Sequence, residues 1–384
     1  MEQSQRISQV IEEYDSQGWH RTGTHVDHSS ADWLRDRLRD VGIHAELERF
    51  ELLRVDPDLC YLQVGDEIIE GLPLFDGSFT DSNGVSGLLG NVESNSDIAV
   101  VEVRRGVEGR GGDDMDMARR SGKYKAILAV TMGDSPGLMA TNARDFHNPF
   151  GPPVLQVSSE HRDVVMTALS SQQEVQLFAT ASRTDTYSSN VVGLLPGKDR
   201  TLAPLVVMTP RSGWWHCASE RGGGLACLLE VMGSLGDLGS PRDVICLATS
   251  AHELGFYGIH AFLEGRPGFV EKSFGWIHFG ANVGASQLPG LRFSASTADL
   301  TRQVEGNLLT YGLGYAIPAG YGVTVGGESQ EIARQGGYVT ALVGGNALFH
   351  IETDRWPHAV DVEVVKKAAN AYSDLASKLV RNAD

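Results

Sequence analysis

From about residue 186 the chain alternates apolar strand-like segments with helix-like segments, and this alternation constrains the fold more than any other feature. The strand candidates are NVVGLLPG, APLVVMTP, DVICLATS, FGWIHFGA and VTALVG. The helix candidates between and after them are GGGLACLLEVMGSL, HELGFYGIHAFLE and a terminal helix with Val365, Ala368, Tyr372, Leu375 and Leu379 on one face. Continuous apolar strands joined by helices are typical of a parallel sheet covered on both sides. We therefore predict an α/β fold whose mostly parallel central sheet is flanked by helices, with its site at the carboxyl ends of the strands.

The first 55 residues fit the same fold, whereas residues 56–185 have a different texture. SSADWLRDRLRDVG predicts a helix capped by Ser29 or Ser30 and ended by Gly42, and the strand-like IHAELERFEL follows it. Between residues 56 and 185, short strand candidates at 98–103, 126–132, 154–158 and 175–181 alternate with Gly, Ser and Asp clusters. The prediction is one α/β domain formed by residues 1–55 and 186–384, with an inserted β-rich domain over residues 56–185.

The charge balance excludes several classes of partner. There are 32 Lys+Arg against 49 Asp+Glu, a formal charge of −17, so nucleic acid and anionic membrane surfaces would repel the chain.

The four cysteines form no CxxC pair, which argues against a structural zinc site or a disulfide framework. No basic segment followed by an apolar stretch opens the chain, and no apolar run approaches 18 residues. These features predict a soluble, cytoplasmic protein with a small-molecule substrate.

Three loops that follow strand candidates carry residue types suited to metal binding and to acid–base chemistry. They are VVMTPRSGWWHCASERGGG, LATSAHELG and GNALFHIETDRW. Loops at the carboxyl ends of neighbouring strands converge in an α/β fold, so these side chains can meet. Taken singly, each has a simpler interpretation as a core histidine or as a glutamate that offsets a helix dipole.

Taken together, the three loops resemble the M28 metallopeptidase-like family of zinc aminopeptidases and carboxypeptidases, with a protease-associated (PA) type insert. The resemblance extends over nearly the whole chain, including FGPPVLQVS and SSNVVGLLPG at the insert and the terminal HIETD. The family motifs run as HxD, a bridging Asp, a Glu-Glu pair, a later Asp and a final His. They fall here, in that order, on Pro210 and Ser212, Glu220, His252 and Glu253, a position near Gly280, and His350.

This correspondence implies a site with one metal ion. The positions unique to one family metal are lost, because neither Pro210 nor Gly280 can ligate through a side chain. The positions of the other metal remain as Glu220, Glu253 and His350. The resemblance thus implies one divalent ion, Mn²⁺ or Zn²⁺, with Fe²⁺ or Co²⁺ also suited to oxygen-rich ligation.

The resemblance also implies roles for neighbouring residues. His252 replaces the family's general base, and an imidazole can take a proton from water at neutral pH. Asp354 matches an Asp of the family's terminal motif, although it could equally form a turn. The remaining candidates, expected to contact substrate, are a carboxylate clamp of Arg211 and Arg221, an aromatic slot of Trp214, Trp215, His216 and Tyr257, and Glu328.

Four functions stay open at this point. The favoured one is a single-metal hydrolase that deaminates an aromatic amino carboxylate, 5-nitroanthranilate to 5-nitrosalicylate plus ammonia, because one metal, a base, an aromatic slot and an anion clamp would suit it. The alternatives are a metal-dependent exopeptidase or aminopeptidase, a non-catalytic binding protein on a decayed peptidase fold, and an acyl-transferring cyclase. The PA-like insert is expected to act as a lid or an assembly surface, which suggests a homo-oligomer.

Overall fold

The computed structural model describes residues 1–104, 113–132, 136–320 and 325–382, and its central sheet has a parallel middle and antiparallel flanks. The middle consists of β9 (Val244–Thr249), β8 (Leu205–Pro210), β10 (Gly275–Phe279) and β13 (Val339–Gly344), in that spatial order. On one side β7 (Glu174–Leu195) pairs antiparallel with β9, and on the other β11 (Leu291–Ala295) pairs antiparallel with β13, followed by the short β12 (Ile317–Pro318). The predicted α/β fold is confirmed, and only its edges depart from parallel pairing.

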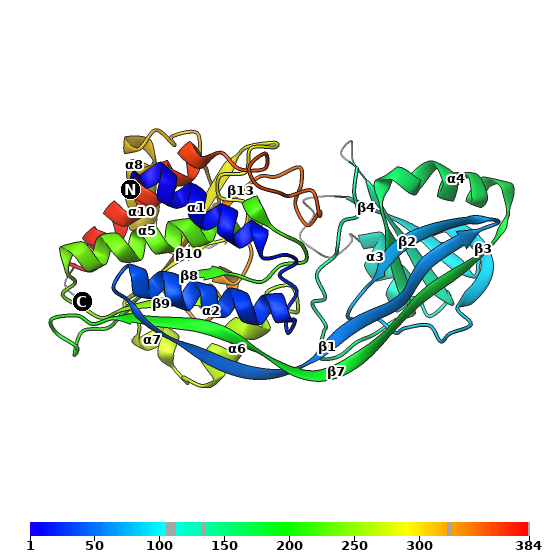
Figure 1. Ribbon diagram of the computed structural model, residues 1–384, viewed down its shortest axis with the longest axis horizontal. Coiled ribbons are helices and arrows are strands. Elements are labelled where there is room, and N and C mark those ends of the chain that lie inside the picture. The colour runs from blue at the N-terminus through cyan, green and yellow to red at the C-terminus, as the bar shows by residue number, and fades with distance from the viewer. Residues whose placement is uncertain (105–112, 133–135, 321–324, 383–384) are drawn as a thin grey trace.

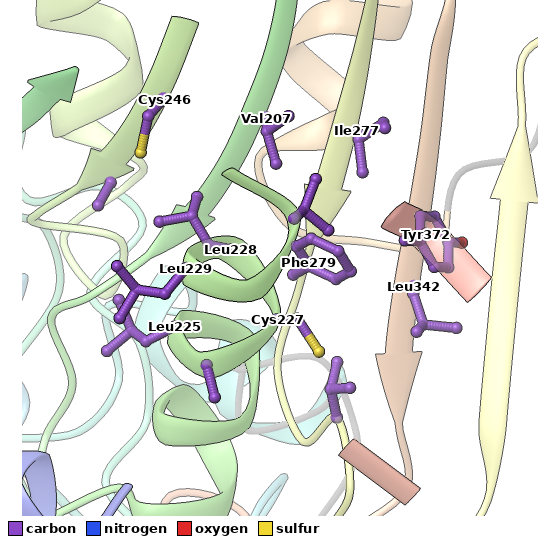
Figure 2. Close-up of a cluster of buried hydrophobic side chains, with 14 of the residues drawn as sticks. Val207, Leu225, Cys227, Leu228, Leu229, Cys246, Ile277, Phe279, Leu342 and Tyr372 are labelled. Carbon is purple, nitrogen blue, oxygen red and sulfur yellow. The ribbon is translucent and has the colours of Figure 1, made fainter. Parts of the chain in front are cut away.

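Helices cover both faces of this sheet (Figure 1). On one face lie α1 (Gln3–Ser16), α2 (His25–Asp40), α5 (Gly223–Leu238), α8 (Ala298–Thr310) and α10 (Val362–Leu379). On the other lie α6 (Tyr257–Glu264), the short α7 (Phe269–Lys272) and α9 (Ser329–Arg334). Side chains alternate along a strand, so Val207 of β8 faces the first layer while Val206 and Met208 face the second. Figure 2 shows the first layer, in which α5 packs against Val207, Ile277 and Phe279.

The insert builds a second group of strands on the extensions of β1 (His44–Val64) and β7. Its strands are β2 (Glu67–Pro73), β3 (Val85–Asn91), β4 (Ile98–Arg104), β5 (Ala126–Met132) and β6 (Val154–Val157), with β3, β4, β5 and β6 parallel. The helices α3 (Asp113–Arg120), η1 (Ser159–His161) and α4 (Arg162–Ser171) belong to the same lobe. Two apolar clusters fill this lobe; one consists of insert residues alone, and the other also takes in Ile351 from the α/β part.

The chain enters and leaves the insert without a break in its strands. β1 and β7 pair antiparallel from the α/β lobe into the insert, and Asp56 pairs with Ser182 within that ladder. The predicted boundaries at residues 56 and 185 therefore fall inside two long strands that run between the lobes in Figure 1.

The helix predicted from Ser29 begins earlier, at His25. Thr24 is the N-cap, and its hydroxyl accepts a hydrogen bond from the Asp27 backbone N–H at 3.4 Å. The first turn is polar because it faces buried hydrogen-bond partners: Asp27 is 0% exposed and accepts from the Ser188 hydroxyl. Apolar periodicity alone could not locate this start.

Among the helices of the described segments, none has the length and apolar character needed to cross a membrane.

Candidate active site

The three loops picked out in the sequence meet at the carboxyl ends of β8, β9 and β13. Each contains a non-glycine residue in the left-handed region, namely Cys217 (φ 56°), Ala251 (φ 58°) and His350 (φ 61°). Such conformations cost roughly 1–3 kcal/mol and cluster at functional sites, where the surrounding structure holds them in place. The strain supports the prediction that these loops form a functional site.

The turn that carries Glu220 is a single π-helical turn, η2 (Ala218–Gly222), leading into α5. The glycines after it are required by close packing. A Cβ at Gly223 would lie 1.9 Å from the carbonyl oxygen of Val283, and one at Gly224 would lie 2.7 Å from Thr209 Oγ1. The glycine run thus lets the turn sit directly on the strand ends.

Arg221 lies between the two carboxylates that were predicted to bind a metal. Its Nη2 is 2.8 Å from Glu220 Oε1 and 2.8 Å from Glu253 Oε1. Its Nε donates to the Ser212 carbonyl oxygen at 2.7 Å, and the Ser212 hydroxyl donates to Glu253 Oε2 at 2.6 Å. Burial opposes the charged form of Arg221, but the two carboxylates outweigh it and raise the pKa of the guanidinium. The positive charge at this centre is supplied by the chain itself.

His350 completes the cluster from the loop after β13. Its Nε2 lies 3.5 Å from Glu220 Oε1, and the described residues offer a hydrogen bond to neither atom. The Glu220 contact with Arg221 is close enough for an ion pair but lacks hydrogen-bond geometry. Burial lowers the pKa of His350 to about 3, so its ring is neutral at pH 7.

The predicted metal ligands therefore converge, but they do not fit an ion as they lie. Among the described residues, no group of three or more His, Cys, Asp or Glu side chains is arranged to hold a metal. The oxygens of Glu220 and Glu253 that face each other are joined by Arg221. An ion between them would meet a fixed guanidinium, and like charges in a buried site repel strongly.

Asp354 positions the Glu220 turn. Its Oδ1 accepts from the Ser219 N–H at 2.9 Å and from the Ser219 hydroxyl at 2.7 Å, and its Oδ2 accepts from the Glu220 N–H at 2.9 Å. It is 1% exposed, and burial raises its pKa to about 7 despite these hydrogen bonds. Asp354 thus holds the backbone of the Glu220 turn through three hydrogen bonds.

His252 and Glu328 form a buried pair beside the cluster. His252 Nδ1 lies 3.1 Å from Glu328 Oε1, and the Thr249 hydroxyl also bonds the Glu328 carboxylate, at 2.7 Å to Oε2. A carboxylate at Nδ1 selects the tautomer with Nδ1–H, which leaves Nε2 as the proton acceptor. Burial lowers the pKa of His252 well below its usual value, and Arg221 lowers it further, so the ring is neutral at pH 7. Glu328, expected to meet substrate, instead orients the candidate base.

Both arginines of the predicted carboxylate clamp are committed to internal partners. Arg211 is 1% exposed, with Nη1 2.9 Å from Asp27 Oδ1 and Nη2 donating to the Ser189 carbonyl oxygen at 2.7 Å. Arg221 is bound between its carboxylates as described. The structure thus replaces the predicted clamp with two buried structural ion pairs.

The predicted aromatic slot is not formed: Trp214 and Trp215 are buried, and the half-buried His216 and Tyr257 do not line the pocket of His252. Trp214 is 2% exposed and donates its Nε1–H to Asn142 Oδ1, while Trp215 is 5% exposed and donates to the His350 carbonyl oxygen. His216 Nδ1 bonds the Asp15 carbonyl oxygen, and Tyr257 packs edge-on against Phe50. The two tryptophans hydrogen-bond to site loops and do not line the pocket that contains His252.

The pocket at this site has a volume of about 270 Å³, and most of its walls were not predicted. Of the predicted site residues only His252 lines it. The other polar lining residues are Asn142, Arg144, His278, Asn282, Arg292 and Asn346, and the aromatic ones are Phe256 and Phe349. His278 gave a sequence signal, as a histidine inside the apolar strand FGWIHFGA, and Arg144 could not be foreseen because it comes from the insert.

Comparisons with known proteins relate the chain by its fold alone. No protein-family model matches the sequence, and no curated protein does either. Among solved structures it is similar to a zinc aminopeptidase from Bacillus subtilis, BSAP, with 16% identity over 98% of this chain and 94% of that one and a TM-score of 0.77. It also resembles a Peptidase M28 precursor from Shewanella amazonensis (14% identity, 100% and 96% coverage, TM-score 0.75) and an aminopeptidase from Aneurinibacillus sp. strain AM-1 (15%, 97% and 93%, 0.70). At these identities the likeness shows the fold alone, a mixed α/β fold with a large central sheet flanked by helices.

Proposed function

We propose that this protein is a hydrolase that cleaves a C–N bond of a small substrate in the manner of an exopeptidase. The observation that carries the proposal is the His252–Glu328 pair, in which an oriented imidazole lines the 270 Å³ pocket. The aminopeptidase fold of the neighbours supports the same reaction class. This favours the exopeptidase alternative over the aromatic aminohydrolase, whose predicted slot of Trp214 and Trp215 is buried.

The chain's own residues suffice to describe the proton transfers. His252 Nε2 takes a proton from a water molecule as the water oxygen bonds to the carbonyl carbon of the scissile amide. The C–N bond then breaks, and the same proton passes from His252 to the leaving nitrogen. Burial is the largest cause of the lowered pKa of His252, and the positive charges of Arg221 and Arg144 lower it further. The positive potential of these two arginines would also favour the negative charge that develops on the carbonyl oxygen.

We assign no step to a metal ion. The zinc aminopeptidase among the neighbours supports the expectation of a divalent ion, but Arg221 lies between the carboxylates that would bind it. Whether Zn²⁺ or Mn²⁺ is needed is decided by measuring turnover after dialysis against a chelator and after adding each ion back.

The test of the proposal is a panel of dipeptides, N-acyl amino acids and aminoacyl anilides, assayed for release of the free amine. We expect His252→Ala to reduce turnover by roughly 10²–10⁴-fold, the usual contribution of a general base. Glu328→Gln should reduce it less, because the ring remains but its orientation weakens. His358→Ala is a matched control, since this exposed histidine lies outside the pocket. Turnover that survives His252→Ala would contradict the mechanism.

A second candidate function is ligand binding without catalysis, and Arg221 specifically favours it. An arginine that neutralises Glu220 and Glu253 is what a peptidase fold without its metal would need to keep two buried carboxylates stable. This candidate predicts ligand binding with no turnover on any member of the panel, with or without added metal.

A further inference from the structure

We infer that the pocket binds a small carboxylate, so that the substrate presents its acidic end, and not a free amine, to this site. The inference rests on the proposed function for the identity of the site but uses different residues. It concerns Arg144, Arg292 and the amide side chains of the pocket walls, none of which belongs to the Glu220–Arg221–Glu253 cluster.

The charged side chains of the pocket walls favour an anion. The described residues that line the pocket include two arginines but no aspartate or glutamate, and burial keeps its two histidines neutral, although the protein as a whole carries a formal charge of −17. Glu328, the nearby carboxylate, is 0% exposed and is bound to His252 and Thr249. A cationic pocket on an anionic protein selects anions locally and disfavours the ammonium group of a peptide N-terminus.

Two amide side chains of the pocket walls are oriented as hydrogen-bond donors. Asn142 Oδ1 accepts from Trp214 Nε1, which can only donate, so the Nδ2 of Asn142 is the end left for a ligand. Asn282 Oδ1 accepts from Asn346 Nδ2 at 3.0 Å, which again leaves its own Nδ2 as a donor. The walls thus combine oriented N–H groups with guanidinium groups, and their natural partner is an acceptor-only group such as a carboxylate.

One buried polar side chain of the pocket has no hydrogen-bond partner among the described residues. His278, at the carboxyl end of β10, is 0% exposed and lines the pocket, and neither of its ring nitrogens bonds any described residue. A buried polar group without a hydrogen bond costs about 1–3 kcal/mol, and a bound ligand would remove that cost. The glycines at 280 and 327 keep the space beside the ring open, since a Cβ at either would lie 3.3 Å from His278 Cε1.

The rest of the lining sets the ligand's size. Phe256, Phe349, Val325 and Val343 supply apolar walls, and 270 Å³ is near the lower limit for small-molecule pockets. One amino acid side chain plus its carboxylate suits this volume. The substrate class is therefore a small N-acyl amino acid or a dipeptide held by its carboxylate.

The test compares three ligands of the same shape, 3-phenylpropionate, 3-phenylpropionamide and 3-phenylpropylamine, by isothermal titration calorimetry on the full chain at low salt. We expect the acid to bind at least about 10-fold more tightly than the amide or the amine. Added salt should reduce the affinity for the acid alone. A tighter-binding amine, or equal affinities for all three, would overturn the inference.

Variants locate the effect. Arg292→Gln, at an exposed position of the pocket wall, should reduce the affinity for the acid by about 10- to 100-fold and leave the affinity for the amide unchanged. Arg302→Gln is the matched control, because this arginine is 68% exposed on α8 and lies outside the pocket. An Arg292→Gln protein that binds the acid as tightly as the wild type would refute the assignment.

Binding and turnover separate the two proposals. Tight binding of the acid without hydrolysis of any panel substrate would sustain the carboxylate pocket and reject the hydrolase. Hydrolysis with no preference for acids would do the reverse.

Discussion

Replacing Arg221 by alanine is the most informative perturbation of this molecule. The change leaves Glu220 and Glu253 buried, 1% and 2% exposed, without the guanidinium that each contacts at 2.8 Å. Removing one partner of a buried ion pair costs about 3–5 kcal/mol, because an uncompensated charge remains. We expect a loss of this size in the free energy of unfolding at pH 7. Arg221→Lys keeps a positive charge but not the fork geometry, so it should lose less.

The loss should depend on pH in a defined direction. Burial already raises the pKa of Glu220 and the charge of Arg221 lowers it, so the loss of Arg221 raises the folded-state pKa of Glu220 further. A carboxyl with a raised folded pKa stabilises the protein fully below its unfolded pKa, and that stability is lost as the pH rises through the folded pKa. The deficit of Arg221→Ala relative to the wild type should therefore grow from pH 4 to pH 8.

A metal should compensate the variant but not the wild type. With Arg221 gone, Glu220, Glu253 and His350 could approach a shared ion, and Zn²⁺ at 100 times its dissociation constant would restore about 2.7 kcal/mol. The assay is urea unfolding followed by tryptophan fluorescence, at several pH values, with and without Zn²⁺. A pH-independent loss below about 1 kcal/mol, or equal Zn²⁺ stabilisation of the wild type, would refute the view that Arg221 replaces a metal.

Three further changes test other parts of the structure. Asp354→Asn should reduce the dependence of the free energy of unfolding on pH. In the wild type, a carboxyl with a folded pKa of about 7 makes the protein less stable by about 4 kcal/mol between pH 4 and pH 7, at 1.36 kcal/mol per pKa unit. Urea unfolding at several pH values measures this slope, and an unchanged slope in the variant would show the reasoning to be wrong. Gly223→Ala should lower the melting temperature by many degrees because its Cβ would meet the Val283 carbonyl oxygen at 1.9 Å, whereas Gly306→Ala, with open space around it, should not. Arg211→Lys should reduce stability by about 1–3 kcal/mol through its buried ion pair yet leave the affinity for 3-phenylpropionate unchanged, and a weakened affinity in calorimetry would restore Arg211 to the clamp.

The sequence predicted the fold well because its signals are local. Continuous apolar strands such as DVICLATS and the Gly-rich start of α5 require only short-range patterns, and both appear in the structure as β9 and α5. The same patterns missed the start of α2, where Asp27 is buried by hydrogen bonds instead of apolar contacts. Polar burial follows tertiary partners, and no periodicity reports it.

The site was predicted only in part, for a similar reason. Motif spacing brought Glu220, Glu253 and His350 to one place, but it could not show that Arg221 turns inward between the carboxylates. The side chain of an arginine that follows a glutamate can point to solvent or to the interior. Here Arg221 lies in the π-helical turn and is buried, and the sequence does not signal that turn. Arg144 comes from a distant part of the chain, so only the assembled structure could place it beside His252.

The two long strands β1 and β7 have a mechanical consequence. They form a two-stranded antiparallel ladder between the lobes, and the register of this ladder shifts only between Pro57 and Cys60. Backbone hydrogen bonds from Ala140 to His350 and from Ala143 to Glu253 also attach the insert directly to two of the site loops. The insert is therefore attached to the α/β lobe at two places, through the continuous β1–β7 ladder and through the loops that carry His350 and Glu253, which ties its position to the geometry of the site.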